Sequence, residues 1–490
     1  MCILKIVLVF TKDRARASLF YLLQLRYSVE NDFNAEYKSI GGVFIVQETL
    51  SKKFWLLMIA LFTAMVLAAC AGGEDNDSDS TDSANSGNDE DEEVSGDEGA
   101  EITAWAWDPN FNIAALNLAL EHYENEDFQM EIIENAQDDI VQKLNTGLSS
   151  GTMQGMPNIV LIEDQRAQSF LQSYPDAFYA IGDYFETGDF AEYKIPPTSF
   201  DGKQYGLPFD NGATGFFYRT DYLEEAGYSK EDLVDITWEK FVEIAKDVKE
   251  KTGHPMLALD PNDLGILRVM MQTTGTWYTT EDGTINLVDN EPLKVALQHY
   301  KELMNNDLVK LVSDWSQYLA AFNSGDVASV PAGNWIAASI EAEESQKGLW
   351  AAAPTPRLDM DGAKNASNQG GSSWYVLNID GKEAAAEFLG STFGSNADFY
   401  QELLTEVGAI GTYKPASEGD AYQYENEFFG GQQVIQDISQ WMEEIPQVDY
   451  GMNTYGIEDI LSAELQQYLN GKSLEDVLAD AQAQAENQFK

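Results

Sequence analysis

In the first part of the folded chain, segments in which apolar residues recur every second position alternate with segments in which they recur at helical spacing. Alternation at residues 102–107 predicts a strand, and the apolar spacing that follows, up to residue 123, predicts a helix. The same order returns as a strand at 128–134, a helix at 138–149 and a buried strand at 157–162. Strands that alternate with helices are typical of a largely parallel sheet, so we expect an α/β fold here.

A second pair of strands is predicted further along the chain. An apolar run at 205–209 ends in the polar bend Asp210-Asn211-Gly212, and an aromatic-rich run follows at 212–218. Thr237 then precedes apolar residues at helical spacing, and Gly253 follows them. This pattern predicts an amphipathic helix that begins after Thr237 and ends at Gly253.

The remaining chain predicts more helices joined by polar turns. Ser473 is the expected N-cap of the last helix. A loop is expected at 275–278, between two of the helices. The helices are expected at residues 221–226, 266–274, 292–305, 384–393, 461–471 and 474–481.

A secretion signal precedes the folded part. Lys52 and Lys53 stand before an apolar run at 54–69, and small residues lead to Cys70. The sequence Leu-Ala-Ala-Cys resembles a bacterial lipobox, which implies cleavage of the signal peptide (46–69) and lipidation of Cys70. A transmembrane anchor with a chance cysteine is the alternative.

Residues 1–45 stand before this signal, although signals normally begin the chain. A ribosome-binding sequence could encode Gly41-Gly42-Val43, and a GTG start codon could encode Val46. Our hypothesis is that translation begins at Val46, so that residues 1–45 are not translated or have no structural role. N-terminal sequencing of the translated precursor tests this hypothesis.

An acidic linker, residues 70–100, follows the signal. Its residues 71–100 hold no aromatic and no basic side chain but many Asp and Glu. Such a segment cannot bury enough apolar surface to fold, and its self-repulsion extends it. We expect a disordered tether between a lipid anchor and the folded part, with weak calcium binding as the alternative.

The charge and the cysteine count exclude several classes of function. The chain carries 29 basic and 82 acidic residues, a net charge of −53, which disfavours nucleic acid and anionic lipid as partners. Cys2 and Cys70 are its only cysteines, so no disulfide framework is expected. The three histidines are scattered, and no phosphate-binding, dinucleotide-binding or nucleophile-elbow motif occurs. We expect no metal, no cofactor and no catalytic residues.

Several motifs together resemble a known family. These motifs are Tyr-Gly-Leu-Pro at 205–208, Tyr-Arg-Thr-Asp at 218–221, Ala-Gly at 226–227 and Thr-Trp-Glu at 237–239. Later blocks extend the likeness: Gly-Asn-Trp at 333–335, Gly-Gly-Ser at 370–372 and Asn-Gly-Lys-Ser at 470–473. From residue 102 to residue 489 the chain is similar to the extracellular solute-binding proteins of ABC sugar importers, the carbohydrate-binding group that includes maltose-binding protein.

The resemblance implies a periplasmic-binding-protein-like fold of two α/β lobes joined by hinge crossings. It places the first crossing near Asp210. It also implies a monomer that binds a sugar between the lobes and delivers it to the permease of an importer whose ATP is hydrolysed by another subunit. The expected N-terminal lobe is 101–211 plus 373–412, and the expected C-terminal lobe is 212–372 plus 413–490.

Two kinds of residue are candidates for the ligand site. In α/β sheets, ligands bind beyond the carboxyl ends of the strands, where polar side chains can meet sugar hydroxyls. Sugars also stack on aromatic rings, and the resemblance places several aromatic loop residues at the cleft. The predicted ligand-binding residues are Trp107, Asp108, Glu163, Asp164, Gln165, Asp210, Asn211, Trp277, Trp335, Trp374 and Tyr455.

Other ligands and one other function remain open. The same fold can bind a polyol, a glycerophosphodiester or a polyamine. The lack of clustered basic residues argues against phosphate, and the aromatic count favours sugar. Paired carboxylates such as Glu163 and Asp164 are also used by glycosidases, so a tethered glycan-acting enzyme is the remaining alternative.

Overall fold

The structure is a computed structural model that describes residues 36–40, 43–47, 101–280 and 282–489. The chain divides into two units, Met1–Glu92 and Glu93–Lys490. In the first unit, β1 (Glu36–Ile40) and β2 (Val43–Gln47) pair as antiparallel strands. The predicted start residue Val46 lies in β2 and remains a hypothesis. The signal segment at 54–69, Cys70 and the acidic linker lie outside the described residues, so they too remain predictions.

A five-stranded sheet forms the first half of the second unit, which we call the N-terminal lobe. Its strand order is β4-β3-β5-β14-β8. β3 is parallel to both of its neighbours, whereas β14 is antiparallel to β5 and to β8. The predicted alternation of parallel strands with helices is confirmed. The strands are β3 (Ile102–Ala106), β4 (Met130–Glu134), β5 (Ile159–Glu163), β8 (Gly206–Pro208) and β14 (Ser372–Val376).

Helices cover both faces of this sheet. Ala104 of β3 packs in one core cluster with Leu116, and its neighbour Trp105 packs in another with Ile140. Because successive strand side chains point to opposite faces, α3 and α4 lie on opposite sides of the sheet. The helices of this lobe are α3 (Asn112–His122), α4 (Gln137–Ser150), α5 (Asp164–Ser173), α6 (Ile195–Thr198), α13 (Lys382–Ser391) and α14 (Ala397–Glu402).

Strand β5 passes directly into helix α5. Glu163 is the last residue of β5 and Asp164 is the first residue of α5. The side chains of Glu163, Asp164 and Gln165 therefore leave the backbone in different directions. Because the strand passes directly into the helix, the direction of each of these side chains determines whether it can reach a ligand.

The C-terminal lobe is built on a three-stranded antiparallel sheet with the order β12-β9-β13. A separate parallel pair joins β10 to β11. The strands are β9 (Thr214–Arg219), β10 (Leu257–Leu259), β11 (Val309–Leu311), β12 (Ser329–Gly333) and β13 (Trp350–Pro354). The helices are α7 (Thr220–Glu225), α8 (Trp238–Thr252), α9 (Gly265–Gln272), α10 (Glu291–Asn305), α11 (Trp315–Asn323), α12 (Ala337–Glu341), α15 (Val434–Glu443), α16 (Thr454–Leu469) and α17 (Leu474–Gln488).

The predicted helix caps are confirmed. The Thr237 hydroxyl accepts a hydrogen bond from the Lys240 amide at 3.2 Å, and the Ser473 hydroxyl accepts one from the Asp476 amide at 3.1 Å. Gly253 ends α8 with φ +80°, a conformation that side chains with a Cβ rarely adopt.

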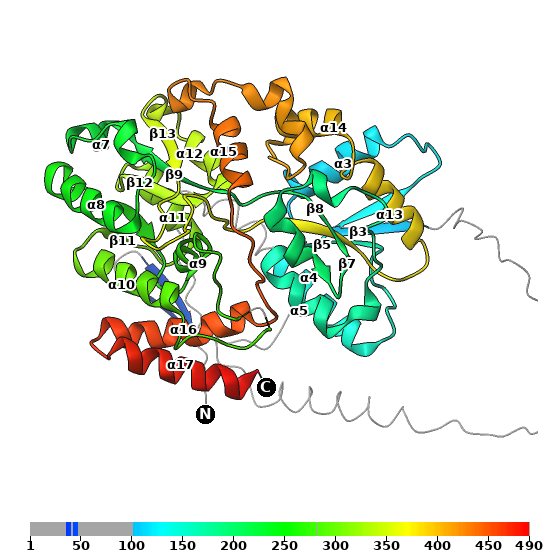
Figure 1. Ribbon diagram of the computed structural model, residues 1–490, viewed down its shortest axis with the longest axis horizontal. Coiled ribbons are helices and arrows are strands. Elements are labelled where there is room, and N and C mark those ends of the chain that lie inside the picture. The colour runs from blue at the N-terminus through cyan, green and yellow to red at the C-terminus, as the bar shows by residue number, and fades with distance from the viewer. Residues whose placement is uncertain (1–35, 41–42, 48–100, 281, 490) are drawn as a thin grey trace, which may run out of the picture. The chain divides into compact units, whose positions relative to one another are not determined.

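Three chain segments lie against one another where the two sheets meet (Figure 1). We call residues 209–213, which join β8 to β9, the first crossing, and residues 355–371, which join β13 to β14, the second crossing. The Gln369 amide donates to the Gly212 carbonyl at 2.8 Å. The Thr412 amide donates to the Phe209 carbonyl at 3.0 Å, which adds a third segment. The predicted lobe boundaries at 211/212, 372/373 and 412/413 fall beside these contacts and remain predictions.

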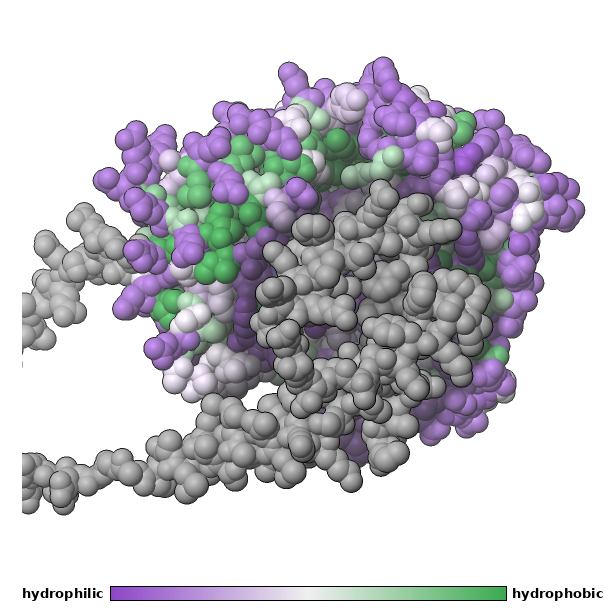
Figure 2. Space-filling model, turned by 180° about the vertical axis from the view of Figure 1, so that it is seen from behind, coloured by the Kyte–Doolittle hydropathy of each residue, from purple (hydrophilic) through white to green (hydrophobic). Residues whose placement is uncertain are grey.

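Where the surface is coloured in Figure 2, hydrophilic residues cover most of it, and hydrophobic residues form smaller patches. This agrees with the large acidic excess of the chain. Within the described ranges, none of the helices has the length and apolar character needed to cross a membrane.

Candidate ligand-binding cleft

The carboxyl ends of β3 and β5 meet at one edge of the N-terminal sheet. Trp107 follows β3 directly, and Glu163 is the last residue of β5. Both line a small cavity together with Arg166 of α5. The Arg166 guanidinium donates to Glu163 Oε2 at 3.2 Å, which holds the carboxylate at this edge.

Tyr455 joins this edge to the C-terminal lobe. It lies in the first turn of α16, and its hydroxyl donates to Glu163 Oε1 at 2.7 Å. The Arg166 guanidinium lies 3.9 Å from the centre of the Tyr455 ring, and the Arg268 guanidinium lies 5.6 Å from it. Burial and then the Glu163 carboxylate raise the pKa of Tyr455, so the hydroxyl stays protonated and acts as a donor.

Arg268 of α9 makes a second contact between the lobes. Its Nη1 donates to Gln165 Oε1 at 2.9 Å and to Glu458 Oε2 at 3.3 Å. Nη2 lies 3.4 Å from Asp263 Oδ1. Burial by itself lowers the pKa of Arg268, but Glu458, then Tyr455 and Asp263, outweigh it and raise that pKa above its ordinary value. The guanidinium is therefore charged and shared between two carboxylates.

Glu458 is the buried partner of Arg268. The Tyr278 hydroxyl donates to Glu458 Oε1 at 2.8 Å, so both carboxylate oxygens are engaged. Burial raises the pKa of Glu458, and the nearby Arg268 guanidinium opposes that rise.

Three buried polar atoms at this place have no hydrogen-bond partner within the described part of the chain. They are Gln165 Nε2, Arg268 Nε and Gln369 Oε1. A Cβ on Gly265 would lie 2.6 Å from Gln369 Nε2 and 3.4 Å from Arg268 Nη2, so these side chains converge on that glycine. Because buried polar groups are normally hydrogen-bonded, these three atoms are open to a partner such as a ligand or a water molecule.

Exposed aromatic rings stand beside these polar atoms. The Trp335 ring is 37% exposed, and its Nε1 donates to the Gln369 carbonyl at 2.9 Å. Trp315, the first residue of α11, is 52% exposed, with its ring 5.9 Å from that of Trp335 and 5.5 Å from that of Tyr318. Large aromatic side chains exposed next to unpaired polar atoms suit the flat apolar faces and the hydroxyl edges of sugars.

A buried lysine ties the crossings together. Lys194 is fully buried and donates to Asp164 Oδ2 at 2.5 Å, to the Asp210 carbonyl at 2.8 Å and to the Ser372 carbonyl at 2.9 Å. Burial raises the pKa of Asp164, and Lys194 opposes that rise. Asp210 Oδ1 accepts from the Ser372 amide at 2.7 Å, so this carboxylate also holds the start of β14, directly after the second crossing.

Four predicted ligand-binding residues have side chains that are buried and packed or hydrogen-bonded within the protein, and they stay predictions as ligand contacts. Asp164 is bound by Lys194 and by the Ser373 hydroxyl. Asn211 bonds to the Ile410 carbonyl, the Ala213 amide and Asn334. Trp277 is 2% exposed and donates to the Thr454 hydroxyl. Trp374 is completely buried between the rings of Phe209 and Phe393.

The other predicted residues lie at or near the facing edges of the lobes. Asp108 caps a turn, because its Oδ1 accepts from the Asn110 amide at 2.8 Å. The remaining ones stay predictions as ligand contacts: Trp107, Asp108, Glu163, Gln165, Asp210, Trp335 and Tyr455.

The sequence interpretation missed Arg166, Arg268, Trp315 and Gln369. Arg268 had a usable signal, because it stands in the otherwise apolar run Gly-Ile-Leu-Arg-Val-Met-Met, and every residue of α9 is buried. A charged residue inside such a run needs a buried partner. Nothing local distinguishes Arg166, Trp315 or Gln369 from ordinary surface residues.

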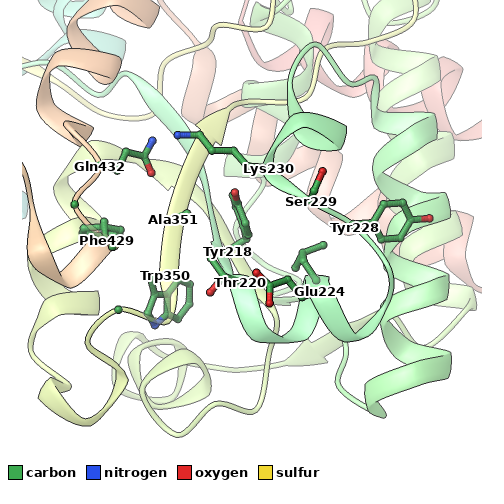
Figure 3. A pocket seen from close by; sticks show the side chains of 14 residues that line it. Tyr218, Thr220, Glu224, Tyr228, Ser229, Lys230, Trp350, Ala351, Phe429 and Gln432 are labelled. Carbon is green, nitrogen blue, oxygen red and sulfur yellow. The ribbon is translucent and has the colours of Figure 1, made fainter.

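A different cavity, of about 390 Å³, lies within the C-terminal lobe (Figure 3). Residues of β9, α7, β13 and the 429–432 segment line it, and Tyr218, Lys230 and Glu224 point toward its centre. Three of its aromatic residues are almost inaccessible, since Tyr218 and Phe429 are each 2% exposed and Trp350 is 1% exposed, whereas Tyr228 is half-buried. Because all of its walls come from one lobe, this cavity is separate from the interlobe cleft. Among the residues with described positions, no group of His, Cys, Asp and Glu side chains is arranged to hold a metal ion.

Comparison with known proteins agrees with this geometry. Residues 119–429 match the family model described as bacterial extracellular solute-binding protein. The chain belongs to this family. Members of the family are substrate-binding proteins with an extracytoplasmic location, and the predicted family and two-lobed fold are confirmed.

The relatives of this solute-binding protein include sugar-binding proteins. It is 44% identical over 393 residues to the lactose-binding protein of Rhizobium radiobacter, covering 80% of this chain and 93% of that protein. It is 25% identical over 339 residues to the arabinooligosaccharide-binding protein of Halalkalibacterium halodurans, covering 67% of this chain and 74% of that one. The sugar-binding protein MalE of Xanthomonas citri superposes with a TM-score of 0.67 at 16% identity, covering 79% of this chain and 97% of that one, which shows the fold.

Proposed function

We propose that this protein is the solute-binding subunit of an ABC importer and that it captures a small neutral oligosaccharide, such as a disaccharide containing galactose, between its lobes. The observation that carries the proposal is the cluster of unpaired buried polar atoms of Gln165, Arg268 and Gln369 beside the exposed rings of Trp335 and Trp315. The 44% identity to a lactose-binding protein over almost the whole of that protein supports a sugar of this kind.

The charges around the cluster favour a neutral ligand. Arg268 already faces two carboxylates, Glu458 and Asp263, and Arg166 faces Glu163. A phosphodiester would meet these carboxylates and find no unshared guanidinium, whereas sugar hydroxyls can both donate to carboxylates and accept from N–H groups. A polyamine would have to displace the arginines from the same carboxylates.

The rest of the proposal concerns how the protein is held and what it serves. A lipid on Cys70 anchors the protein at the outer face of the cell membrane, and residues 71–100 form the tether. The bound protein, acting as a monomer, then delivers its sugar to the membrane-spanning permease subunits. The relatives support a role in transport rather than catalysis, so the sugar leaves the protein chemically unchanged.

A thermal-shift panel tests this function. Lactose, galactobiose, maltose, arabinotriose, glycerophosphocholine and putrescine are each added to the purified folded part, residues 101–490. We expect at least one sugar to raise the melting temperature, because a ligand that binds only the folded state stabilises it. A response to glycerophosphocholine or putrescine without any response to sugars would refute the sugar proposal. Chromatography of the recovered sugar would reveal hydrolysis if the protein were a glycan-acting enzyme.

A further inference from the structure

Four buried side chains form a continuous hydrogen-bonded chain that runs from one lobe to the other. The Tyr278 hydroxyl donates to Glu458 Oε1 at 2.8 Å, and Glu458 Oε2 accepts from Arg268 Nη1 at 3.3 Å. Arg268 Nη1 also donates to Gln165 Oε1 at 2.9 Å. Tyr278, Glu458 and Arg268 belong to the C-terminal lobe, whereas Gln165 lies on α5 of the N-terminal lobe.

This series of hydrogen bonds determines which way the Gln165 carboxamide faces. Its Oε1 accepts from Arg268 Nη1 and lies 3.4 Å from the Tyr455 hydroxyl, whose other partner is the Glu163 carboxylate. A guanidinium can only donate, so only the carbonyl oxygen of Gln165 can face it. A rotation of the carboxamide by half a turn would set its NH₂ group against the guanidinium and leave both donors unpaired. Nε2 must therefore point away from Arg268, and it is the buried nitrogen that has no partner within the described residues.

Burial makes each of the four side chains hold its hydrogen-bonded neighbour in place. Gln165 is 3% exposed, Glu458 8%, Arg268 9% and Tyr278 fully buried. A buried guanidinium without its carboxylate is costly, so Glu458 keeps Arg268 in position. The Tyr278 hydroxyl occupies the other oxygen of Glu458, which leaves Oε2 to face Arg268.

We propose that Tyr278, Glu458 and Arg268 are positioning residues that reach across the cleft and orient Gln165, so that its Nε2 donates to a hydroxyl oxygen of the sugar. The contact exists only when the lobes are together, and closure of the lobes and completion of this donor are therefore one event. We call Tyr278, Glu458 and Arg268 the relay. Without the relay, the Gln165 carboxamide would be free to rotate even in the closed cleft. The inference rests on the proposed sugar-binding function.

A double-mutant cycle on Tyr278 and Gln165 tests the relay. Tyr278→Phe removes one hydroxyl and keeps the buried ring, and this residue makes no direct contact with Gln165 among the described interactions. In the wild-type background we expect Tyr278→Phe to raise the Kd for the sugar by about 5-fold, the scale of one hydrogen bond. In the Gln165→Ala background the same change should have no further effect, because the group that it positions has gone. Well-separated residues without such a connection give additive effects.

Matched variants separate positioning from general loss of stability. Tyr400→Phe removes an equally buried hydroxyl, which donates to the Phe393 carbonyl at 2.8 Å within the N-terminal lobe. It should lower the melting temperature of the free protein and leave the Kd unchanged. Gln447→Ala removes an exposed contact to Glu192 and should also leave the Kd unchanged. Arg268→Lys keeps the charge but loses the planar fork, so we expect it to weaken binding at least as much as Tyr278→Phe.

The outcomes are distinct, with Kd measured by isothermal titration calorimetry. Equal fold-changes for Tyr278→Phe in both backgrounds, or an unchanged Kd in the wild-type background, would overturn the relay while sugar binding stands. A wild-type protein that binds no sugar would instead overturn the proposed function. If Gln165→Ala binds too weakly to measure, Gln165→Asn takes its place, because its shorter carboxamide also loses the bond to Arg268.

Discussion

Replacing Trp335 by alanine should weaken sugar binding by about 2 kcal/mol, which is about 30-fold in Kd. The Trp335 side chain is 37% exposed. A tryptophan offers up to about 250 Å² in all, so roughly 90 Å² is open to a stacked sugar. At about 25 cal/mol per Å² this area corresponds to about 2 kcal/mol. The assay is isothermal titration calorimetry with the sugar that gives the largest thermal shift.

The free protein should be affected less than the complex. Trp335 Nε1 donates to the Gln369 carbonyl, so the substitution removes one partly exposed hydrogen bond and costs about 1 kcal/mol of folding stability. Tyr424, which is 55% exposed, serves as the matched control: Tyr424→Ala should leave the Kd unchanged. A large fall in melting temperature with an unaltered Kd would place Trp335 in the core and refute the reasoning.

Three further predictions concern the anchor, the first crossing and the buried carboxylate. Cys70→Ser should shift the full-length protein from the detergent phase to the aqueous phase in detergent partitioning; an unmodified wild type, already aqueous, would contradict the lipid anchor. Gly212→Ala should lower the melting temperature strongly, because its Cβ would collide with the Gln369 carbonyl, whereas Gly188→Ala has open space and should change little. Small-angle scattering with and without sugar tests closure of the lobes. Because the folded-state pKa of Glu458 is raised above its ordinary value of 4.5, its contribution to stability is present below pH 4.5 and is lost as the pH rises through the raised pKa. In denaturant titrations, the unfolding free energy of wild type minus that of Glu458→Gln should therefore decrease as the pH rises over that range. A difference that does not change with pH would contradict the raised pKa.

The secondary structure could be predicted because its signals are local. The hydroxyls of Thr237 and Ser473 cap the helices that follow them, and Gly253 ends α8 in a left-handed conformation, each through contacts within a few residues. The alternation of strands and helices at the start of the folded part likewise predicted the parallel core of the N-terminal sheet. The motif order was sufficient to predict the family.

The ligand site could be predicted only in outline. Strand ends mark the edge of the sheet at which polar side chains gather, and Glu163 and Trp107 do lie there. Asp164 is next to Glu163 in the sequence, yet it faces the fully buried Lys194 under the crossings. Only the passage of β5 directly into α5 decides this, because it turns adjacent side chains in different directions.

By itself, the sequence determined the main elements, their caps and the family. The tertiary structure alone decided which tryptophans are exposed: Trp335 is open, while Trp374 is enclosed by rings from distant parts of the chain. It also brought Arg268 to Gln165 and Glu458, which are 103 and 190 residues away in the chain. The physical reason is that burial and pairing depend on contacts between distant segments, whereas hydrophobic periodicity and capping depend on neighbours within one or two turns.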